Sequence, residues 1–464
     1  MKKLDTSYDK LLDKAQRIHF IGIGGSGMCP LAEILLSEGK TITGSDVDNE
    51  SDTVNRIRGL GVHVDIGQRA ENIGDAELVV YTAAIQKDNP ELLGAQERGI
   101  PTIERSILLG ALCRRYNNTI AVSGTHGKTT TTSMISQILI DAQISPSVII
   151  GGKLPLIGSN GQAGKSEYMV CEACEFVDTF LQITPACAVI LNIDADHLEY
   201  FGTVENTARS FHQFCEQTRD MIIVNGEDKF SMVAVEGIEG KQIVTFGLSE
   251  GCDYRAVNIN ADNSSHWEFD IMKHGELLCH AKLRVPGRHN VLNSLAAAAA
   301  AEYAGATPEQ IAEGLDNFTG AARRYDVHIV KNGITIADDY AHHPTELAAI
   351  LNACKEMPFG RVRCVFQPFT YSRTKQHLQE FADVLKIADE VMLTEIMAAR
   401  EVDDLGVKSE QLEALVPQSR LFGSMQEIAD YALDTAREGD LIITCGCGDI
   451  YKCAKLMTKK LQAM

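Results

Sequence analysis

The sequence predicts an α/β protein whose sheets are mostly parallel. Three observations support this prediction: short apolar runs alternate with helix-length segments, two glycine-rich turns each follow such a run, and acidic residues stand where later runs end. Alternating strands and helices are typical of β-α-β units, whose crossovers return the chain to a parallel strand. The expected strands are 18–23, 41–44, 78–82, 119–123, 168–171, 188–192, 222–225, 334–337, 361–367, 390–393 and 441–445.

The chain length and the spacing of the two glycine-rich turns predict three domains. At 464 residues the chain is long enough for two to four domains of ordinary size. The turns at 22–27 and 124–128 are too far apart to belong together, so each should open its own sheet. A later break is expected where the Ala-rich helix of 296–301 and its follower end. We therefore expect domains at 1–115, 116–320 and 321–464.

The composition narrows the classes of partner. The formal net charge is −20, and so acidic a surface repels nucleic acid and anionic membranes. The sequence has no apolar run near the ~18–20 residues that span a bilayer and no apolar signal core at its start, so we expect a cytoplasmic protein. The 13 cysteines, an odd number, are interpreted as reduced thiols. Monomer and homodimer both stay open.

The first glycine-rich turn has the pattern G-x-G-x-x-G. Its glycines are Gly22, Gly24 and Gly27, with Ser26 between the last two and a helix expected from about Cys29. Glycines in this pattern let backbone N–H groups approach a pyrophosphate at a helix N-terminus. Asp46 ends the next strand, about 20 residues later, where an acid commonly binds a ribose hydroxyl. The pattern alone leaves open NAD, another nucleotide and a purely structural turn.

The second turn is typical of a phosphate-binding loop. After the strand 119–123 come Gly124, Thr125, His126, Gly127, Lys128, Thr129 and Thr130. Consecutive N–H donors, one lysine and a following hydroxyl suit a nucleoside triphosphate with magnesium. Val122 stands where the general pattern has glycine, so the loop is a variant form. We expect ATP or GTP, with Lys128 on the outer phosphates and Thr129 on the metal.

Acidic residues at later strand ends complete the expected metal site. Glu172 follows the strand 168–171, with Glu175 and Asp178 just beyond, and His197 ends the cluster of 192–197. Parallel strands bring their carboxyl ends to one sheet edge, so Lys128, Thr129, Glu172 and His197 should converge there. This predicts one or two Mg²⁺ ions bound by Thr129, Glu172 and His197. A helix-capping role for His197 is the alternative.

Further motifs follow in order along the chain. They are N-x-x-x-D-H at 192–197, P-G-R-H-N-V-L-N at 286–293, R-R-Y at 323–325, D-D-Y-A-H-H-P-T-E at 338–346 and Q-P-F-T-Y-S-R at 367–373. Together with I-G-I-G-G-S-G-M at 21–28 and G-T-H-G-K-T-T-T-T at 124–132, they resemble the Mur ligases, from about residue 18 to residue 449. Within that family, the 338–346 segment and the first turn are similar to the alanine-adding branch.

The resemblance implies a fold and an activity. The fold would be the three-domain Mur ligase architecture, with Rossmann-like first and last domains and a central P-loop ATPase domain. The activity would be ATP-dependent joining of L-alanine to the lactyl carboxylate of UDP-N-acetylmuramate in peptidoglycan precursor synthesis. The reaction would pass through an acyl phosphate and release ADP and phosphate. The three domains would bind the sugar nucleotide, ATP and the amino acid in that order.

The resemblance also implies roles for single residues. On the sugar-nucleotide side they are Gly24, Ser26, Gly27, Asp46 and Gln68. On the ATP side they are the loop 124–130, His289, Asn290 and Asn293, with Arg324 and Asp339 from the third domain. The residues that would line the reacting carboxylate and alanine are Tyr340, His342 and Arg373. His342 is a candidate for removing the amine proton, with a merely solvated histidine as the alternative, and Arg373 or a metal ion would balance the oxyanion.

The chain departs from the family pattern at three positions. Cys174 replaces an acid near the metal, Gln68 stands where histidine is common, and Phe369 replaces the histidine of Q-P-H.

Three other functions stay open as alternatives. They are a murein-recycling ligase that adds a tripeptide to the same sugar nucleotide, an NAD-linked dehydrogenase, and a nucleotide-dependent switch without chemistry.

Overall fold

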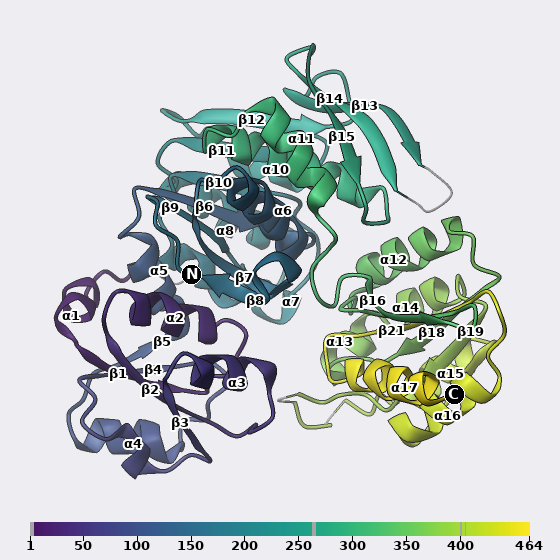
Figure 1. Ribbon diagram of the computed structural model, residues 1–464, viewed down its shortest axis with the longest axis horizontal. Helices are drawn as coiled ribbons and strands as arrows, with labels where there is room; N and C mark the ends of the chain where they lie inside the picture. The colour runs from purple at the N-terminus through teal and green to yellow at the C-terminus, as the bar shows by residue number, and fades with distance from the viewer. Residues whose placement is uncertain (1–3, 262–265, 400, 404) are drawn as a thin grey trace. The chain divides into compact units, whose positions relative to one another are not determined.

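The computed structural model describes residues 4–261, 266–399, 401–403 and 405–464 (Figure 1). These residues form helices and mostly parallel strands in three sheets, which confirms the predicted α/β class. The chain divides into two compact units, which we describe separately. The first is 1–258 with 269–281 and 292–318, and the second is 259–268 with 282–291 and 319–464. In the described part of the chain, no helix is both long and apolar enough to cross a membrane.

The first unit begins with a five-stranded parallel sheet of order β3-β2-β1-β4-β5. Its strands are β1 (Arg17–Ile21), β2 (Thr41–Asp46), β3 (His63–Ile66), β4 (Leu78–Tyr81) and β5 (Thr102–Glu104). The helices of this region are α1 (Asp9–Lys14), α2 (Cys29–Ser37), α3 (Asp52–Gly59), α4 (Pro90–Glu97) and α5 (Arg105–Cys113). The first glycine turn joins β1 to α2, and α2 begins at the expected residue.

The larger sheet has ten strands in the order β15-β14-β13-β12-β11-β10-β6-β9-β7-β8. They are β6 (Asn118–Ser123), β7 (Ser147–Leu154), β8 (Ser159–Gln162), β9 (Tyr168–Glu172), β10 (Cys187–Ile190), β11 (Met221–Asn225), β12 (Gln242–Gly247), β13 (Tyr254–Ala261), β14 (Trp267–Lys273) and β15 (Glu276–Leu283). The associated helices are α6 (Lys128–Asp141), α7 (Leu198–Phe201), α8 (Val204–Gln217), α9 (Lys229–Val235), α10 (His289–Tyr303) and α11 (Pro308–Asn317). The central strand β6 lies between β10 and β9 and is parallel to both.

Ten of the described strands are not among the predicted ones: β3, β5, β7, β8, β12 to β15, β16 (Asp326–Lys331) and β20 (Ser419–Leu421). In β14 the buried residues Trp267, Phe269 and Ile271 alternate with more exposed ones, as in a sheet that packs on one face only. The prediction rests on continuous apolar runs, which are typical of strands buried on both faces. In the ten-stranded sheet it includes the central strands β6, β9, β10 and β11 and omits the strands on either side of them.

The second unit contains a six-stranded sheet of order β16-β17-β21-β18-β19-β20. Its strands are β16 (Asp326–Lys331), β17 (Ile334–Asp339), β18 (Arg361–Phe366), β19 (Glu390–Leu393), β20 (Ser419–Leu421) and β21 (Asp440–Cys445). Its helices are α12 (Pro344–Glu356), α13 (Tyr371–Gln376), α14 (Leu378–Leu385), α15 (Ser409–Leu415), α16 (Met425–Asp434) and α17 (Tyr451–Ala463). Strand β16 pairs antiparallel with β17, whereas β17, β21, β18, β19 and β20 pair parallel with one another in that order.

A fully buried arginine ties this sheet to its covering helix. Arg363 of β18 has no exposed side-chain surface and donates from Nε to Glu390 Oε2 at 2.6 Å. Its other nitrogens donate to the Ala432 carbonyl at 2.7 Å and to Thr435 Oγ1 at 2.6 Å. The guanidinium also lies 3.6 Å from the buried Asp440 carboxylate, so an apolar replacement would leave Asp440 and the Ala432 carbonyl without this buried partner.

We therefore expect Arg363→Met to lower the free energy of unfolding by about 3–5 kcal/mol, because it leaves buried acceptors and part of an ion pair without a partner. Denaturant unfolding of the full chain measures the change. The control is Lys386→Met, which removes the exposed Lys386–Asp383 pair and should cost less than about 1 kcal/mol. Equal effects of the two substitutions would contradict the assigned role of Arg363.

Candidate active site

The first glycine turn is held in place by Asp46 at the end of β2. The Gly24 N–H donates to Asp46 Oδ2 at 2.8 Å, and the Asp48 N–H donates to Asp46 Oδ1 at 3.0 Å. A β-carbon at Gly24 would lie 2.5 Å from Val54 Cγ2, so the close approach of α3 requires glycine there. Asp46 thus lies against the turn as expected, and it organises the turn itself. Its contact with a ribose stays a prediction.

Two cavities extend from this turn. Cavity A, of about 740 Å³, is lined by the predicted residues Gly24, Asp46 and Gln68 together with the helix-capping Asn89. Cavity B, of about 300 Å³, is lined by the predicted residues Ser26, Gly27 and Glu172. Gly25 and Thr82 line both cavities, so the two are adjacent at the turn. The structure therefore brings the predicted sugar-nucleotide residues of the first unit together around two adjacent cavities.

The second glycine turn is pinned to the end of β10. Asn192 Oδ1 accepts from the His126 N–H at 2.8 Å, and its Nδ2 donates to the His126 carbonyl at 3.0 Å. The Thr125 N–H donates to the Asn192 carbonyl at 3.0 Å, and Thr125 Oγ1 accepts from the Asp194 N–H at 2.9 Å. Gly127 has a φ of 87°, and a β-carbon there would lie 2.7 Å from Asn293 Oδ1. Asn293 of α10 therefore packs directly on the loop.

Lys128, the first residue of α6, is surrounded by acceptors. Its Nζ donates to the carbonyls of Gly124 and Thr125 and to Glu175 Oε2, the last two at 3.0 Å. Burial by itself lowers the pKa of Lys128, but the negative charges around it, with Glu175 foremost, raise that pKa above its ordinary value. The lysine is therefore a fixed positive charge at neutral pH. Thr129 is buried behind it.

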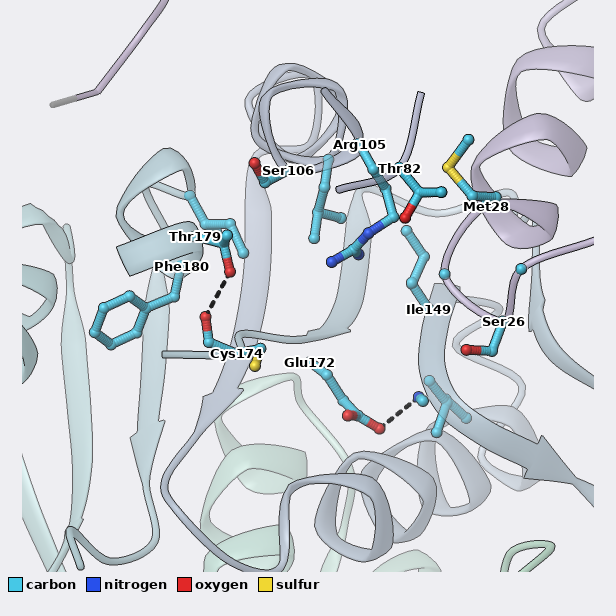
Figure 2. Close-up of a pocket in the computed structure, with 16 residues that line it drawn as sticks. Ser26, Met28, Thr82, Arg105, Ser106, Ile149, Glu172, Cys174, Thr179 and Phe180 are labelled. Atoms are coloured by element: carbon cyan, nitrogen blue, oxygen red, sulfur yellow. Dashed lines mark hydrogen bonds between the residues drawn. The ribbon is translucent and has the colours of Figure 1, made fainter. Parts of the chain in front are cut away.

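Glu172, the last residue of β9, lies on the wall of cavity B (Figure 2). Its Oε1 accepts from the Gly151 N–H at 2.5 Å, the contact that Figure 2 marks with a dashed line. Cys174 lines the same cavity, and its carbonyl accepts from Thr179 Oγ1 at 2.9 Å. Burial raises the pKa of the Cys174 thiol, so the residue that departs from the family pattern is uncharged at neutral pH. Glu172 is thus the carboxylate of this wall.

His197 lies at the N-terminal end of α7 in the left-handed region, with a φ of 56°. Its ring centroid is 4.5 Å from that of Phe176, and it is not among the described residues that line cavity B. The structure thus does not place His197 with Glu172 on that wall, and its metal-binding role stays a prediction. Asp178, noted beyond Glu172, accepts from Tyr200 Oη at 2.7 Å and from the Ser210 hydroxyl, so it fastens α7 and α8.

In the second unit, the predicted nucleotide residues His289 and Asn290 open α10. Asn290 is buried, and its Nδ2 donates to the Pro286 carbonyl at 2.7 Å. Asp339 is the last residue of β17, and Arg324 lies just before β16. The Asp339 carboxylate accepts from the Tyr325 and Ala341 N–H groups, both at 2.8 Å. The Arg324 guanidinium lies 5.0 Å from the centre of the Tyr340 ring. These last residues therefore form one cluster.

The predicted proton acceptor His342 follows that cluster. Its Nδ1 lies 3.1 Å from both the Tyr340 carbonyl and Glu346 Oε2. Two acceptors at Nδ1 favour the tautomer whose proton sits there, and Nε2 is then the basic nitrogen. The ring also lies edge-on to Tyr340 and Phe369, at 5.4 and 6.5 Å. Arg373 lies on α13, which the Thr370 side chain caps by accepting from the Arg373 N–H at 3.4 Å.

Sequence reasoning missed two charged residues at this site. Glu175 was noted without a role, although its spacing three residues after Glu172 could have suggested a partner for Lys128. Arg105, the first residue of α5, lines cavity B and was not singled out. It follows a three-residue strand without any recognisable motif, so only the folded chain reveals it.

The buried Asp339 generates a pH prediction. Burial raises its pKa from 3.8 to about 6, against the opposing charge of Arg324. The unfolded chain therefore loses this proton first, and the stability of the fold should decrease as pH rises from about 4 to about 6, by about 3 kcal/mol in total. In Asp339→Asn this part of the decrease should vanish, as measured by unfolding at several pH values.

The matched control for this prediction is Asp383→Asn at an exposed carboxylate, which should keep the decrease between pH 4 and 6. A wild-type-like pH profile in Asp339→Asn would mean that Asp339 is ionised throughout this range.

Comparisons with known proteins find relatives over most of the chain. Family models match residues 17–117 (Mur ligase family, catalytic domain), 122–301 (Mur ligase middle domain) and 323–448 (Mur ligase, glutamate ligase domain). The UDP-N-acetylmuramate–L-alanine ligase of Caldanaerobacter subterraneus subsp. tengcongensis is 44% identical over 447 residues, covering 95% of this chain and 97% of that protein. The enzyme of the same name from Clostridium botulinum is 41% identical over 456 residues, covering 97% and 99%.

A solved structure shares the whole architecture. The UDP-N-acetylmuramate-alanine ligase of Thermotoga maritima has a TM-score of 0.82 at 28% identity, covering 96% of this chain and 99% of that one. The murein peptide ligase of Psychrobacter arcticus shares the fold, with a TM-score of 0.74 at 23% identity over 97% and 99% of the two chains. The family models and the near full-length relatives lead to one conclusion: the chain belongs to the Mur ligase family.

Proposed function

We propose that the protein joins L-alanine to the lactyl carboxylate of UDP-N-acetylmuramate at the expense of ATP, as a step in peptidoglycan precursor synthesis. The observation that carries this proposal is the proximity of the first glycine turn to Glu172 within the first unit. Ser26 and Gly27 of that turn line the same cavity as the Glu172 carboxylate, and a second cavity adjoins it at Gly25 and Thr82. Glu172 in turn acts electrostatically on Lys128 of the second glycine turn. The near full-length relatives that carry this activity in their names support it.

The chemistry requires activation of a poor electrophile. A lactyl carboxylate oxygen attacks the γ-phosphorus of ATP, the bond to the bridging oxygen breaks, and ADP leaves. The alanine amine, as the neutral free base, then attacks the acyl carbon, and inorganic phosphate leaves with the electron pair of the C–O bond. The amine proton goes to a base. Both steps gather negative charge on oxygen, which fixed positive groups stabilise.

The second glycine turn supplies such groups. The N–H donors of 124–130 would surround the β- and γ-phosphates, and Lys128 would balance their charge. In the structure Lys128 is paired with the buried Glu175 and donates to the carbonyls of Gly124 and Thr125, so its ammonium group is held beside the loop. Asn293 of α10 packs on the loop at Gly127, and this contact supports its proposed place in the nucleotide site. His289, Asn290, Arg324 and Asp339 would complete the ATP site.

The donor set fits magnesium. Glu172 offers a carboxylate oxygen on a cavity wall, and Thr129 offers a hydroxyl at the start of α6, which are the hard oxygen ligands that Mg²⁺ prefers. We propose that these two residues hold one ion and that His197 takes part in holding a second. Bound Mg²⁺ would neutralise charge on the phosphates.

The remaining predicted residues divide between the two substrates. Asp46 and Gln68 would hold the nucleoside end of UDP-N-acetylmuramate in cavity A, with the backbone of Gly24, Ser26 and Gly27 on its diphosphate. Tyr340, His342 and Arg373 would receive alanine, with His342 Nε2 as the proton acceptor. These assignments imply functional domains at 1–115, 116–320 and 321–464, which we retain as a proposal, together with a cytoplasmic location where such nucleotides are available.

The nature of the incoming amine can be tested directly. We expect phosphate release from ATP and UDP-N-acetylmuramate to require L-alanine and to be much slower with a murein tripeptide. A coupled phosphate assay with each amine measures this. Faster release with the tripeptide would instead support the murein-recycling reaction, and release with neither would contradict both.

The separation of the two glycine turns predicts a selective effect of Lys128→Ala. Transfer should fall by at least about a thousandfold, because no other cation replaces the lysine on the phosphates. The affinity for UDP-N-acetylmuramate, measured by calorimetry without ATP, should change less than about threefold. The control Lys165→Ala removes an exposed lysine and should alter neither quantity. Equal loss of transfer and sugar-nucleotide binding in Lys128→Ala would show that the two sites are not separate.

A further inference from the structure

Arg105 is an unexplained cation in cavity B. It is half-buried at the start of α5, and Figure 2 shows its side chain extending into the space between Ser106, Thr82 and Ile149. Among the described residues, none forms a hydrogen bond or ion pair with its guanidinium. Two other arginines of this unit behave differently, because Arg56 pairs with Glu33 and Arg114 with Asp9, both at 2.6 Å. Arg105 therefore keeps five N–H donors directed into a cavity.

The first glycine turn is shaped around this side chain. A β-carbon at Gly27 would lie 2.9 Å from Arg105 Nη1 and 3.2 Å from its Cδ. The φ of Gly27 is not among the positive values of this chain, so alanine is compatible with the backbone there. Glycine at position 27 therefore leaves room for the guanidinium that packs on it, and a β-carbon there would displace the Arg105 side chain.

The other side of Arg105 faces the reacting end of the site. Arg105, Glu172 and Cys174 all line cavity B, so the guanidinium lies in the same cavity as the Glu172 wall. A cation that shares a cavity with the first glycine turn and Glu172, and that forms no ion pair with any described residue, is suited to an anionic ligand. The guanidinium fork matches two oxygens of one phosphate or carboxylate.

We infer that Arg105 is a further substrate-binding residue, which holds an oxyanion of the sugar nucleotide by a forked, charge-assisted contact in cavity B. This inference rests on the proposed function. The oxyanion is either a phosphate of the diphosphate or the lactyl carboxylate, since both present paired oxygens. In either case Arg105 fixes the path of the substrate from cavity A towards Glu172.

The test is calorimetric binding of UDP-N-acetylmuramate, without ATP, to the full-length protein and to Arg105→Met. We expect the variant to bind at least about tenfold more weakly, which is the usual size of a lost charge-assisted contact. Arg105→Lys keeps the charge without the fork and should lie between the two. The control Arg98→Met removes an exposed arginine whose guanidinium donates to the Gly74 carbonyl, and it should bind like the wild type.

A second ligand separates the two sources of the oxyanion. UDP-N-acetylglucosamine has the same diphosphate and lacks the lactyl carboxylate. If Arg105→Met weakens both ligands by the same factor, the contact is to the diphosphate. If it weakens UDP-N-acetylmuramate alone, the contact is to the carboxylate. Either result supports the inference.

A double mutant checks that the effect passes through the guanidinium. Gly27→Ala should weaken binding in the wild-type background by displacing Arg105, and it should add little in Arg105→Met. Binding of UDP-N-acetylmuramate by Arg105→Met or Arg105→Lys within twofold of the wild type would overturn the inference. If the wild type binds neither sugar nucleotide, the proposed function itself fails, which is a distinct result.

Discussion

The parallel pairing of β6 with β9 and β10 is the constraint on which the candidate site depends. It places Val122 beside Glu172 and Ser123 beside Ile190, so three strands end at one edge. The pairing continues beyond the strands, since the Leu191 N–H donates to the Ser123 carbonyl and the Ala173 N–H to the Val122 carbonyl. The second glycine turn, the Glu172 carboxylate and Asn192, which braces that turn, are thereby brought together by backbone hydrogen bonds.

Glycine occurs at this site where the side chain of another residue lies close to the backbone of a turn. Gly24 faces Val54, Gly27 faces Arg105 and Gly127 faces Asn293, each at less than 3.0 Å from where a β-carbon would be. In each case a side chain would push away a group that the site uses. The first turn is therefore shaped both by the ligand that it is proposed to hold and by its protein neighbours. This explains why the G-x-G-x-x-G pattern alone did not distinguish a nucleotide site from a structural turn.

Buried charges at the site are compensated unequally. Lys128 has the buried Glu175 as its partner, and Asp178 is bonded by Tyr200 and Ser210. Such pairs fix the position of charged groups before any substrate arrives, which is the preorganisation that phosphoryl transfer requires. Arg105 is the exception among them. Its N–H donors face cavity B, where they are suited to bind an anionic ligand.

The fold class, the two glycine turns, the lysine of the second turn and the central strands of the large sheet could be predicted from the residues alone. These features are local, because a continuous apolar run or a lysine after a glycine turn is recognised from neighbouring residues. The pairing of Glu175 with Lys128, the contact of Asp46 with the first turn and the position of Arg105 in cavity B are visible only in the folded chain. Those contacts join residues that are far apart in the sequence. The residue type at one position does not indicate which distant residue will lie next to it after folding.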